Sequence, residues 1–416
     1  MNIIITGTGF SFPDGTGATS RVLAFAKGLI RNGAQVNVLC PKPTENQHTG
    51  NRNLQLKGVY EGIPFEYTCG QRMVAKSRIG AFLLYLNGLW RACKAILTIN
   101  KKLPVDAILL WYAELPLNFI VFSILAKSIG AILIAEKSEF PFVYSSRTAF
   151  VRMKMFFYQM ITLKVIDGLI VISSFLESYF AIYISKNTKI LRIPILVDTE
   201  SFALSKKNCD NSKHRIIYCG NLEHNGEVPD LLKAFGQVAN DYPQWNLVII
   251  GPLTNSKTAN ALRELVIQQG LVKRVTFMGA VSRSEIPSKL SFGDIMALPR
   301  ASGTFSKAGF PTKLGEYLAT GKPVVVTATG DISEYLKDNE TAYLVSSDDV
   351  DAFAKRLRHV MSHKEESAEV GRCGRDLAIR EFDSYLQSIR LLSFIKELRY
   401  ARIQLTPFRS NNKRIY

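Results

Sequence analysis

Short runs of large hydrophobic residues alternate with amphipathic stretches over the first two hundred residues of the chain. Asn2–Thr6 predicts a buried strand, and the spacing over Thr19–Asn32 predicts a helix that Gly33 ends. Val36–Leu39 predicts the next strand. A strand–helix–strand opening indicates a parallel sheet with helices packed on its faces. Further buried strands are predicted at Asp106–Trp111, Ala131–Ala135 and Leu169–Ile172.

The same alternation starts again near Lys213. It predicts strands at Arg215–Cys219, Leu247–Ile250, Val275–Phe277, Ile295–Leu298 and Val324–Thr327, and helices at Pro229–Asn240, Ala259–Gln269 and Thr312–Ala319. A chain of 416 residues is long enough for two domains. We therefore predict an α/β fold of two facing doubly wound Rossmann-like domains, 1–204 and 214–382, joined by the polar linker Ser205–Lys213. The remaining segment, 383–416, contains a predicted helix over about Asp383–Tyr400 and a basic tail.

Doubly wound sheets bind ligands at the carboxyl ends of their strands, so two such domains are expected to form a cleft between them. After the first strand, a glycine-rich loop carries Gly15 and Gly17 into the first helix. Glycine lets the backbone approach a ligand, and a helix N-terminus favours an anion. A dinucleotide-binding fingerprint is not supported, because its third glycine is Phe12 here. A tight turn without a ligand is an equally good interpretation of this loop alone.

Composition and charge narrow the classes of partner. Hydrophobic residues make up 47% and charged residues 21% of the chain, which excludes a disordered protein. The net charge of +17 favours anionic partners such as nucleotide phosphates, lipid headgroups or nucleic acid. The six cysteines are widely separated, which indicates a reduced, cytoplasmic chain. The N-terminus does not have the pattern of a signal peptide, and no apolar run reaches the length that spans a bilayer; the best candidate, Ile79–Trp90, stops at Arg91.

Three segments of the second domain contain the residues best suited to bind a ligand. They are Tyr218–Leu222, Asp294–Arg300 and Phe310–Val325. In the last of them, Thr312 is expected to cap a helix whose free amides, with Lys313 close by, suit a diphosphate. Glu316 lies one turn further on, where its carboxylate can accept two hydroxyl hydrogen bonds, as a ribose would offer. The alternative is an ordinary helix–strand unit with a surface glutamate.

The order and spacing of these segments resemble the retaining glycosyltransferases of family 4 (group 1), which have the GT-B fold. The resemblance covers the opening glycine loop, the second domain through about Val360 and the terminal helix. It implies that Glu316 binds the nucleotide ribose and that Gly15 and Gly17 face the donor diphosphate. It also implies that Gly279–Val281 and Arg300 flank the base and the donor sugar, and that the terminal helix crosses back onto the first domain.

Three departures from the family pattern concern charge. The first glutamate of the family's paired motif falls at Ala308, the usual arginine after the first glycine of the second domain is Asn221, and the usual lysine nearby is missing. Arg300, Lys307 or Lys313 could substitute for the lost cations, and an inactive relative is an open alternative. The candidate donor-binding residues are therefore Gly15, Gly17, Asn221, Arg300, Lys307, Phe310, Thr312, Lys313 and Glu316.

The first domain offers two carboxylates after the strand at the predicted cleft floor. The stretch Ile134–Pro141 contains no histidine, and Glu136 and Glu139 are the candidate catalytic residues. Either could orient or deprotonate an acceptor hydroxyl, or stabilise positive charge at the anomeric carbon. The alternative is a solvated loop, or Glu136 paired with Lys137. Asp349–Val350–Asp351 is interpreted as a helix start, and no catalytic metal is expected.

Two acid-free stretches of the first domain mix cations with large apolar residues. They run from Tyr67 to Val105 and from Phe140 to Ile166. This pattern suits an interface with anionic lipid, although two core-packed helices with solvated charges would give the same composition. Nucleic acid could use the same charge, but no nucleic-acid module accompanies it, so we expect no nucleic-acid partner.

Together these features predict a metal-independent glycosyltransferase with a nucleotide-diphosphate sugar as co-substrate and no other cofactor. From the resemblance we expect sugar transfer with retention to a lipid-linked glycan, in bacterial surface polysaccharide synthesis on the inner face of the membrane. Two alternatives stay open: a nucleotide-sugar epimerase on the same fold, and a non-catalytic scaffold.

Overall fold

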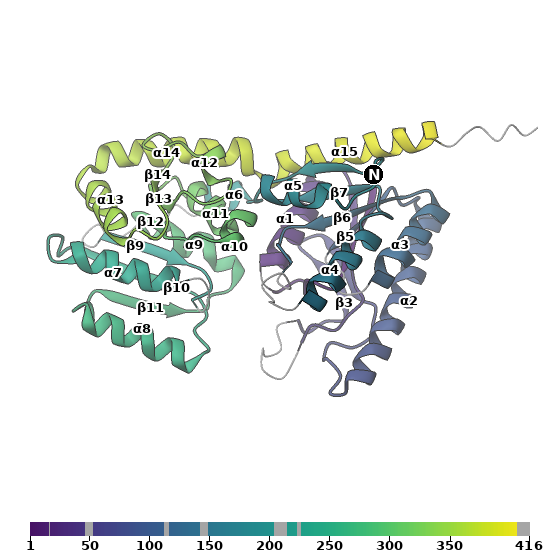
Figure 1. Ribbon diagram of the computed structural model, residues 1–416, viewed down its shortest axis with the longest axis horizontal. Coiled ribbons are helices and arrows are strands. Elements are labelled where there is room, and N and C mark those ends of the chain that lie inside the picture. The colour runs from purple at the N-terminus through teal and green to yellow at the C-terminus, as the bar shows by residue number, and fades with distance from the viewer. Residues whose placement is uncertain are drawn as a thin grey trace, which may run out of the picture.

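The computed structural model describes residues 1–15, 17–45, 53–111, 116–141, 149–203, 214–222 and 226–405. They form two α/β lobes that lie side by side, each around its own sheet (Figure 1). The predicted class, two doubly wound domains, is confirmed. The predicted linker Ser205–Lys213 and the tail 406–416 lie outside the described residues, so the proposed domain boundaries stay a prediction.

Within the described ranges, an eight-stranded sheet forms the centre of the N-terminal domain. Its strands are β1 (Asn2–Gly7), β2 (Gln35–Cys40), β3 (Lys57–Tyr60), β4 (Ile63–Tyr67), β5 (Ala107–Trp111), β6 (Ile132–Lys137), β7 (Gly168–Val171) and β8 (Lys189–Arg192). They follow the order β3-β4-β2-β1-β5-β6-β7-β8. All pairs are parallel except β3 with β4, an antiparallel edge hairpin. The central strands are buried along their whole length because helices cover both faces.

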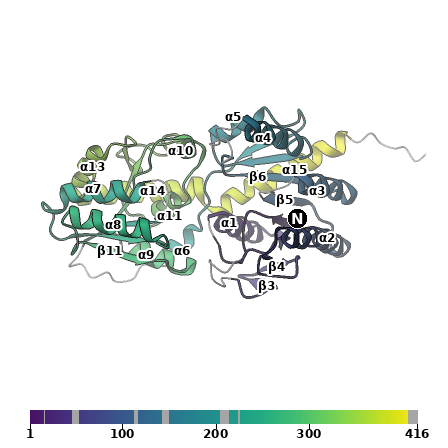
Figure 2. The same ribbon diagram turned by 60° about the horizontal axis from the view of Figure 1, so that its bottom comes forward.

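Two layers of helices enclose this sheet. They comprise α1 (Gly17–Arg31), α2 (Arg78–Lys102), α3 (Pro116–Ile129), α4 (Ala149–Thr162), α5 (Ser174–Ala181) and, from the end of the chain, α15 (Ser384–Leu405). Successive strand residues point to opposite faces, so Ile3 and Ile5 join a core with α1 and α15 while Ile4 joins a core with α2 and α3. The predicted return of the terminal helix to the first domain is confirmed, since α15 packs on α1 (Figures 1 and 2).

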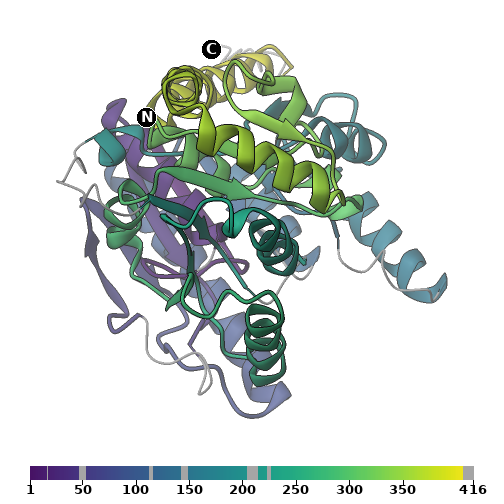
Figure 3. The same cartoon turned by 90° about the vertical axis from the view of Figure 1, so that its left-hand side faces the viewer.

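The C-terminal domain repeats this architecture with six strands in the part of the chain that the structure describes. They are β9 (His214–Cys219), β10 (Trp245–Ile250), β11 (Val275–Gly279), β12 (Ile295–Leu298), β13 (Val324–Thr327) and β14 (Tyr343–Val345), in the order β11-β10-β9-β12-β13-β14. Every pair is parallel. The helices are α7 (Glu227–Ala239), α8 (Ser256–Gln268), α9 (Ile286–Ser291), α10 (Thr304–Ala308), α11 (Thr312–Ala319), α12 (Ile332–Tyr335), α13 (Val350–Ser362) and α14 (Lys364–Phe382). Figure 3 shows this domain in front of the N-terminal one.

The chain passes between the domains at two points that lie together. Val197, just before α6 (Thr199–Ala203), forms a parallel bridge with Asp383, just before α15. Thr199 donates a hydrogen bond to the Asp383 carboxylate at 2.5 Å. Gly315 on α11 packs against Ile195 and Val197, where any side chain would crowd Ile195. The crossing therefore holds α11 close to the segment that leaves the first domain.

Helix α2 corrects one expectation from the sequence. The sequence predicts no apolar run long enough to span a bilayer, but the helix that contains Ile79–Trp90 is 25 residues long, Arg78–Lys102. By length and composition it could cross a bilayer, and only 28% of its most apolar part is buried in the protein. Its buried side, which includes Tyr85, Leu89 and Ile96, packs onto the sheet. A helix packed on a sheet can satisfy the same test of length and composition.

Candidate donor site in the C-terminal domain

Charged residues gather where β9, β11 and β12 end. We define this donor cluster by Tyr218, Glu227, Arg283, Arg300, Lys313 and Glu316. These residues come from β9, α7, the turn after β11, the loop after β12 and α11. The carboxyl ends of parallel strands are the usual position of ligands in such sheets.

Lys313 and Glu227 form the closest ion pair of this cluster. The Lys313 ammonium lies 2.6 Å from Glu227 Oε2 and also donates to the Tyr218 hydroxyl at 2.9 Å. The Tyr218 hydroxyl in turn donates to Glu227 at 2.6 Å. A Cβ at position 220 would lie 2.6 Å from the ammonium, so Gly220 makes room for it. The Glu227 side chain is 4% exposed and that of Lys313 19%.

Arg300 is held by its backbone and reaches the same glutamate. Its N–H donates to Thr327 Oγ1 at 2.7 Å, and that hydroxyl donates back to the Arg300 carbonyl at 2.8 Å. The guanidinium donates to the Gly309 carbonyl at 3.4 Å and lies 3.9 Å from Glu227. Burial lowers the pKa of Arg300, and Glu227 opposes the shift.

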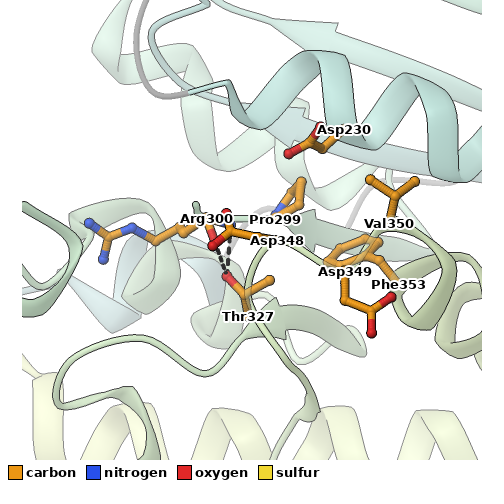
Figure 4. Close-up of a pocket in the computed structure, with 8 residues that line it drawn as sticks. All are labelled: Asp230, Pro299, Arg300, Thr327, Asp348, Asp349, Val350 and Phe353. Atoms are coloured by element: carbon orange, nitrogen blue, oxygen red, sulfur yellow. Dashed lines mark hydrogen bonds between the residues drawn. The ribbon is translucent and has the colours of Figure 1, made fainter. Parts of the chain in front are cut away.

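A small pocket lies behind the Arg300 backbone, with room for about 10 Å³ (Figure 4). It is lined by Asp230, Pro299, Arg300, Thr327, Asp348, Asp349, Val350 and Phe353. The Arg300 side chain extends away from this pocket. The space is of the size of a single water and does not fit a nucleotide.

Glu316 is the second carboxylate of the donor cluster. It is 7% exposed and accepts a hydrogen bond from Arg283 at 2.9 Å. Arg283 itself is 43% exposed. Burial raises the pKa of Tyr60 in the first domain, and the charge of Arg283 opposes the rise. Arg283 is thus the more exposed member of the pair, since the Glu316 side chain is 10% exposed.

The start of α11 differs in one detail from the sequence expectation. Thr312 is the first helical residue and not the cap; the N-cap is Pro311, whose ring offers no acceptor. The first amides of this helix therefore lack the side-chain partner that Thr312 was expected to supply. Phe310 is buried against Tyr335 and Phe382, so its side chain belongs to an aromatic core.

Lys307 lies apart from the donor cluster, in a pocket between the domains. This pocket of about 650 Å³ is lined by Ser174, Phe175, Ser178, Tyr179, Lys307, Gly330, Asp331 and Glu334. Beside it, Ser173 donates a hydrogen bond to the Ala308 carbonyl at 2.6 Å, and Ser174 donates to Asp331 through its N–H and hydroxyl. Ala308, where the family has a carboxylate, is thus buried in a domain contact.

The other donor-side candidates are placed more simply. Asn221 is exposed after β9, and its carbonyl lies 3.5 Å from the Tyr218 hydroxyl. A side chain at Gly15 would collide with the hydroxyls of Ser11 and Thr19, so the turn itself requires this glycine. A Cβ on Gly17, the first residue of α1, would meet nothing within 4 Å, which leaves the helix start open.

Glu136 is not placed as an accessible carboxylate. It ends β6, is 2% exposed and accepts a hydrogen bond from Arg21 Nε at 2.9 Å. The same guanidinium donates to the carbonyls of Ile193 at 2.8 Å and Pro194 at 2.5 Å. Burial raises the pKa of Glu136, and Arg21 opposes the rise. This geometry favours a structural role, in which Arg21 and Glu136 join α1, β6 and the chain that leaves the first domain.

The neighbours of Glu136 have different environments. Lys137 points to the other face of β6, where its ammonium lies 5.4 Å from the ring centres of Phe119 and Tyr158. Burial lowers the pKa of Lys137 to about 8. The sequence left open a pair between Glu136 and Lys137. In the structure the ion-pair partner of Glu136 is Arg21 instead. Glu139 is exposed beyond the end of β6.

Among the described residues, no three His, Cys, Asp or Glu side chains gather as a metal site. The interpretation of Asp349 as a helix cap is confirmed, because its carboxylate accepts a hydrogen bond from the Ala352 N–H at 2.8 Å. Metal independence stays a prediction.

Comparison with known families identifies the domain that holds the donor cluster. Residues 201–376 match the family model described as "Glycosyl transferases group 1". Over these residues the chain is similar to the group 1 glycosyltransferases. The matched segment contains every residue of the donor cluster.

The chain is also similar to relatives of known name. The chain is 23% identical over 247 residues to a GDP-mannose-dependent alpha-(1-6)-phosphatidylinositol monomannoside mannosyltransferase of Mycolicibacterium smegmatis, covering 57% of this chain and 64% of the relative's length. It is 26% identical over 159 residues to a D-inositol 3-phosphate glycosyltransferase of Corynebacterium efficiens, covering 38% of this chain and 36% of that protein.

Solved structures with the same fold span nearly the whole chain. A sucrose-phosphate synthase from Thermosynechococcus elongatus has a TM-score of 0.72 at 18% identity, with 96% of this chain and 99% of that chain covered. HepE from Anabaena, in complex with UDP, has a TM-score of 0.66 at 16% identity, with 95% and 100% covered. The two-domain GT-B arrangement expected from the sequence is thereby confirmed.

Three partners in these sites were missed by sequence reasoning: Glu227, Arg283 and Arg21. Glu227 lies 86 residues from Lys313, and Arg21 lies 115 residues from Glu136. Glu227 had one available signal, a charged residue that begins a helix directly after the glycine-containing loop at β9. Arg21 lies in an otherwise apolar face of α1, where a buried charge requires a partner.

Proposed function

We propose that this chain transfers a sugar, with retention of anomeric configuration, from a nucleotide diphosphate to an acceptor. The observation that carries the proposal is the donor cluster, in which Lys313 and the nearly buried Glu316 lie on the first turns of one helix at the edge of the matched domain. A carboxylate suits ribose hydroxyls, and a cation beside free amides suits a diphosphate.

The proposed donor pose follows from these positions. Glu316 accepts the ribose hydroxyls after Arg283 yields or shares one oxygen, and the start of α11 with Lys313 holds the diphosphate. Arg300, Asn221 and the open start of α1 at Gly17 complete the surroundings. Among donors, GDP-mannose and UDP-glucose are the first to test, because a relative is named as GDP-mannose-dependent and HepE has also been solved with UDP-glucose.

For the acceptor side we propose Glu139 as the group that orients the attacking hydroxyl. It is exposed just beyond β6, whereas Glu136 is held by Arg21. The pocket between α5 and Gly330–Glu334 offers aromatic and hydroxyl groups for an acceptor glycan. Glu139→Gln is expected to lower kcat at unchanged donor affinity, and loss of donor binding instead would contradict this role.

We further propose that the acceptor is a lipid-linked glycan, met at the cytoplasmic face of a bacterial membrane during surface polysaccharide synthesis. Helices α2, α3 and α4 lie side by side and expose large apolar residues: Ile79, Phe82, Leu83, Trp90, Leu117, Ile120, Ile124, Met153, Phe156 and Phe157. Exposed cations accompany them on α2, where Lys94 lies 3.9 Å from the ring centre of Trp90. Interleaved apolar and basic side chains suit anionic headgroups.

Vesicles of phosphatidylglycerol and phosphatidylcholine test this surface. Ile79→Ser is expected to lower vesicle affinity by about fivefold, since it removes one inserted apolar side chain. Ile267→Ser is the matched control, because Ile267 on α8 is exposed to a similar degree, 65% against 75% for Ile79. Equal affinities for the two variants would contradict the proposed membrane face.

The transfer reaction is tested with labelled nucleotide sugars and polyprenyl-diphosphate-linked saccharides, with the anomeric configuration of the product read by NMR. A labelled glycolipid with the donor's configuration is the expected result. Conversion of donor with no acceptor present would instead support an epimerase. Absence of binding to every nucleotide diphosphate would support a scaffold, the alternative that Ala308 and Asn221 favour.

A further inference from the structure

The carboxylate of Glu227 lies beside Lys313 and Arg300, the two cations that we expect a donor diphosphate to contact. This carboxylate lies 2.6 Å from the Lys313 ammonium and 3.9 Å from Arg300 Nε, and it also accepts from Tyr218. Resting on the proposed function, we propose that Glu227 is an internal competitor of the donor diphosphate for Lys313, which lowers nucleotide affinity and speeds product release.

The ion pair is built into the domain. Gly220 leaves the space that the Lys313 ammonium fills, and the Tyr218 hydroxyl bridges the ammonium and the carboxylate. The ammonium also lies 4.5 Å from the centre of the Tyr218 ring. A surface pair without such a frame would be screened and weak, whereas this one is largely buried.

The charges of the cluster explain the expected direction of the effect. Arg283, Arg300 and Lys313 face the carboxylates of Glu227 and Glu316, so the cluster is only weakly positive. A diphosphate carries at least two negative charges and meets a lysine whose N–H groups already point to Tyr218 and Glu227. Binding therefore requires Lys313 to turn away from Glu227 or to share its donors.

Of the two cations beside Glu227, Lys313 is the one that can change its partner from the carboxylate to a phosphate. Arg300 is fixed through its backbone to Thr327, and its side chain is 9% exposed. Lys313 has a long flexible side chain that is more exposed, and an ammonium can redirect its N–H donors by rotation. Displacement of Glu227 by the ligand thus needs movement of one side chain and not of the backbone.

The decisive variant is Glu227→Gln, which keeps the shape and removes the charge. Calorimetry with UDP, GDP, ADP and dTDP is expected to show about tenfold tighter binding of whichever diphosphate the wild type prefers. In the transfer assay the same variant should lower KM for the donor and also lower kcat, because release of the product diphosphate slows. Unchanged or weaker diphosphate binding would overturn the proposal.

Two controls test whether the gain in affinity comes from the Lys313–Glu227 pair or from the removal of any negative charge nearby. Asp230→Asn, on the same helix, should change diphosphate affinity by less than twofold; a gain equal to that of Glu227→Gln would overturn the proposal. In a Lys313→Gln background, Glu227→Gln should give no gain, because the cation that it frees is absent. A tenfold gain that persists in that background would also overturn it.

The same experiment distinguishes this proposal from the proposed function. If neither wild type nor Glu227→Gln binds any nucleotide diphosphate, the proposed function fails. If the wild type binds one and Glu227→Gln gains nothing, only the competitor role fails. Should thermal melting show that Glu227→Gln is unfolded, Glu227→Asp retracts the carboxylate by one methylene, and a gain of about threefold is then expected, with no gain overturning the proposal.

Discussion

Two buried glutamates, Glu136 near the end of β6 and Glu227 at the start of α7, show how the two domains use charge differently. In the N-terminal domain, Arg21 and Glu136 are 5% and 2% exposed, and Arg21 also donates to the backbone carbonyls of Ile193 and Pro194. In the C-terminal domain, Glu227 holds a lysine that is more exposed. A closed pair, whose cation is buried and also bound to backbone carbonyls, serves to hold the structure together, whereas a pair with an accessible cation can exchange its partner for a ligand.

The largest difference is expected in stability when each cation is removed. Arg21→Met leaves Glu136 buried without its charged partner and should lower the free energy of unfolding by about 3–5 kcal/mol. Lys313→Met should cost about 1–2 kcal/mol, because Tyr218 still donates to Glu227. Denaturant unfolding measures both, with Lys57→Met as the control from an exposed pair. An equal loss of unfolding free energy for Arg21→Met and Lys313→Met would contradict the proposed difference between the two pairs.

Lys137 extends the comparison to a buried cation that lies outside the donor cluster, beside the rings of Phe119 and Tyr158. Its pKa of about 8 lies below that of a lysine in the unfolded chain, so the unfolded state binds more protons between about pH 8 and 10.5. Stability therefore rises with pH in that window. Lys137→Met should stabilise the protein at pH 7 by about 2–3 kcal/mol, with the advantage shrinking as the pH approaches 10.5. A difference that does not change with pH would contradict a buried, protonated Lys137.

The affinity for nucleoside diphosphates is expected to depend on Glu316 of the donor cluster and not on Glu136, the partner of Arg21. Glu316→Ala should weaken diphosphate binding by about 1.5–3 kcal/mol, roughly ten- to hundredfold, because it removes charge-assisted hydrogen bonds to the ribose. Glu136→Gln, measured by the same calorimetric titration, should leave that affinity unchanged. If the two variants exchanged these effects, the donor would lie in the first domain.

The smallest change in the free energy of unfolding is expected for the exposed carboxylate of Asp349. Asp349→Ala removes a cap from α13 and should lower the free energy of unfolding by about 1 kcal/mol. Asp351→Ala, two residues on, lacks that capping contact and should cost less. Thermal or denaturant unfolding checks both, and a larger loss for Asp351 would contradict the capping geometry.

The central elements of the fold could be predicted because their hydrophobic patterns are continuous and clearly bounded. Strand β12, helix α11 and strand β13 have the predicted ends, since glycine and proline punctuate the segment around them. The edge hairpin of β3 and β4 was missed because β3 is half exposed and has no apolar run. Helix α14 was missed because charged residues dominate its length and its apolar stripe is narrow.

The candidate site was only partly predictable for a different reason. The sequence indicated Lys313 and Glu316 correctly as neighbours on one helix, but their partners come from elements distant in the chain. Glu136 and Lys137 looked like a local pair, yet adjacent residues of a strand point to opposite faces, so a partner from α1 was required. Local spacing predicts which residues share an element and does not predict which elements meet.

A crystal structure with the preferred nucleoside diphosphate bound tests the central claim most directly. We predict the ribose hydroxyls on Glu316, the phosphates at the start of α11, and the Lys313 ammonium turned from Glu227 towards the phosphates. A nucleotide bound outside the donor cluster, with the Lys313–Glu227 and Arg283–Glu316 contacts intact, would contradict the account.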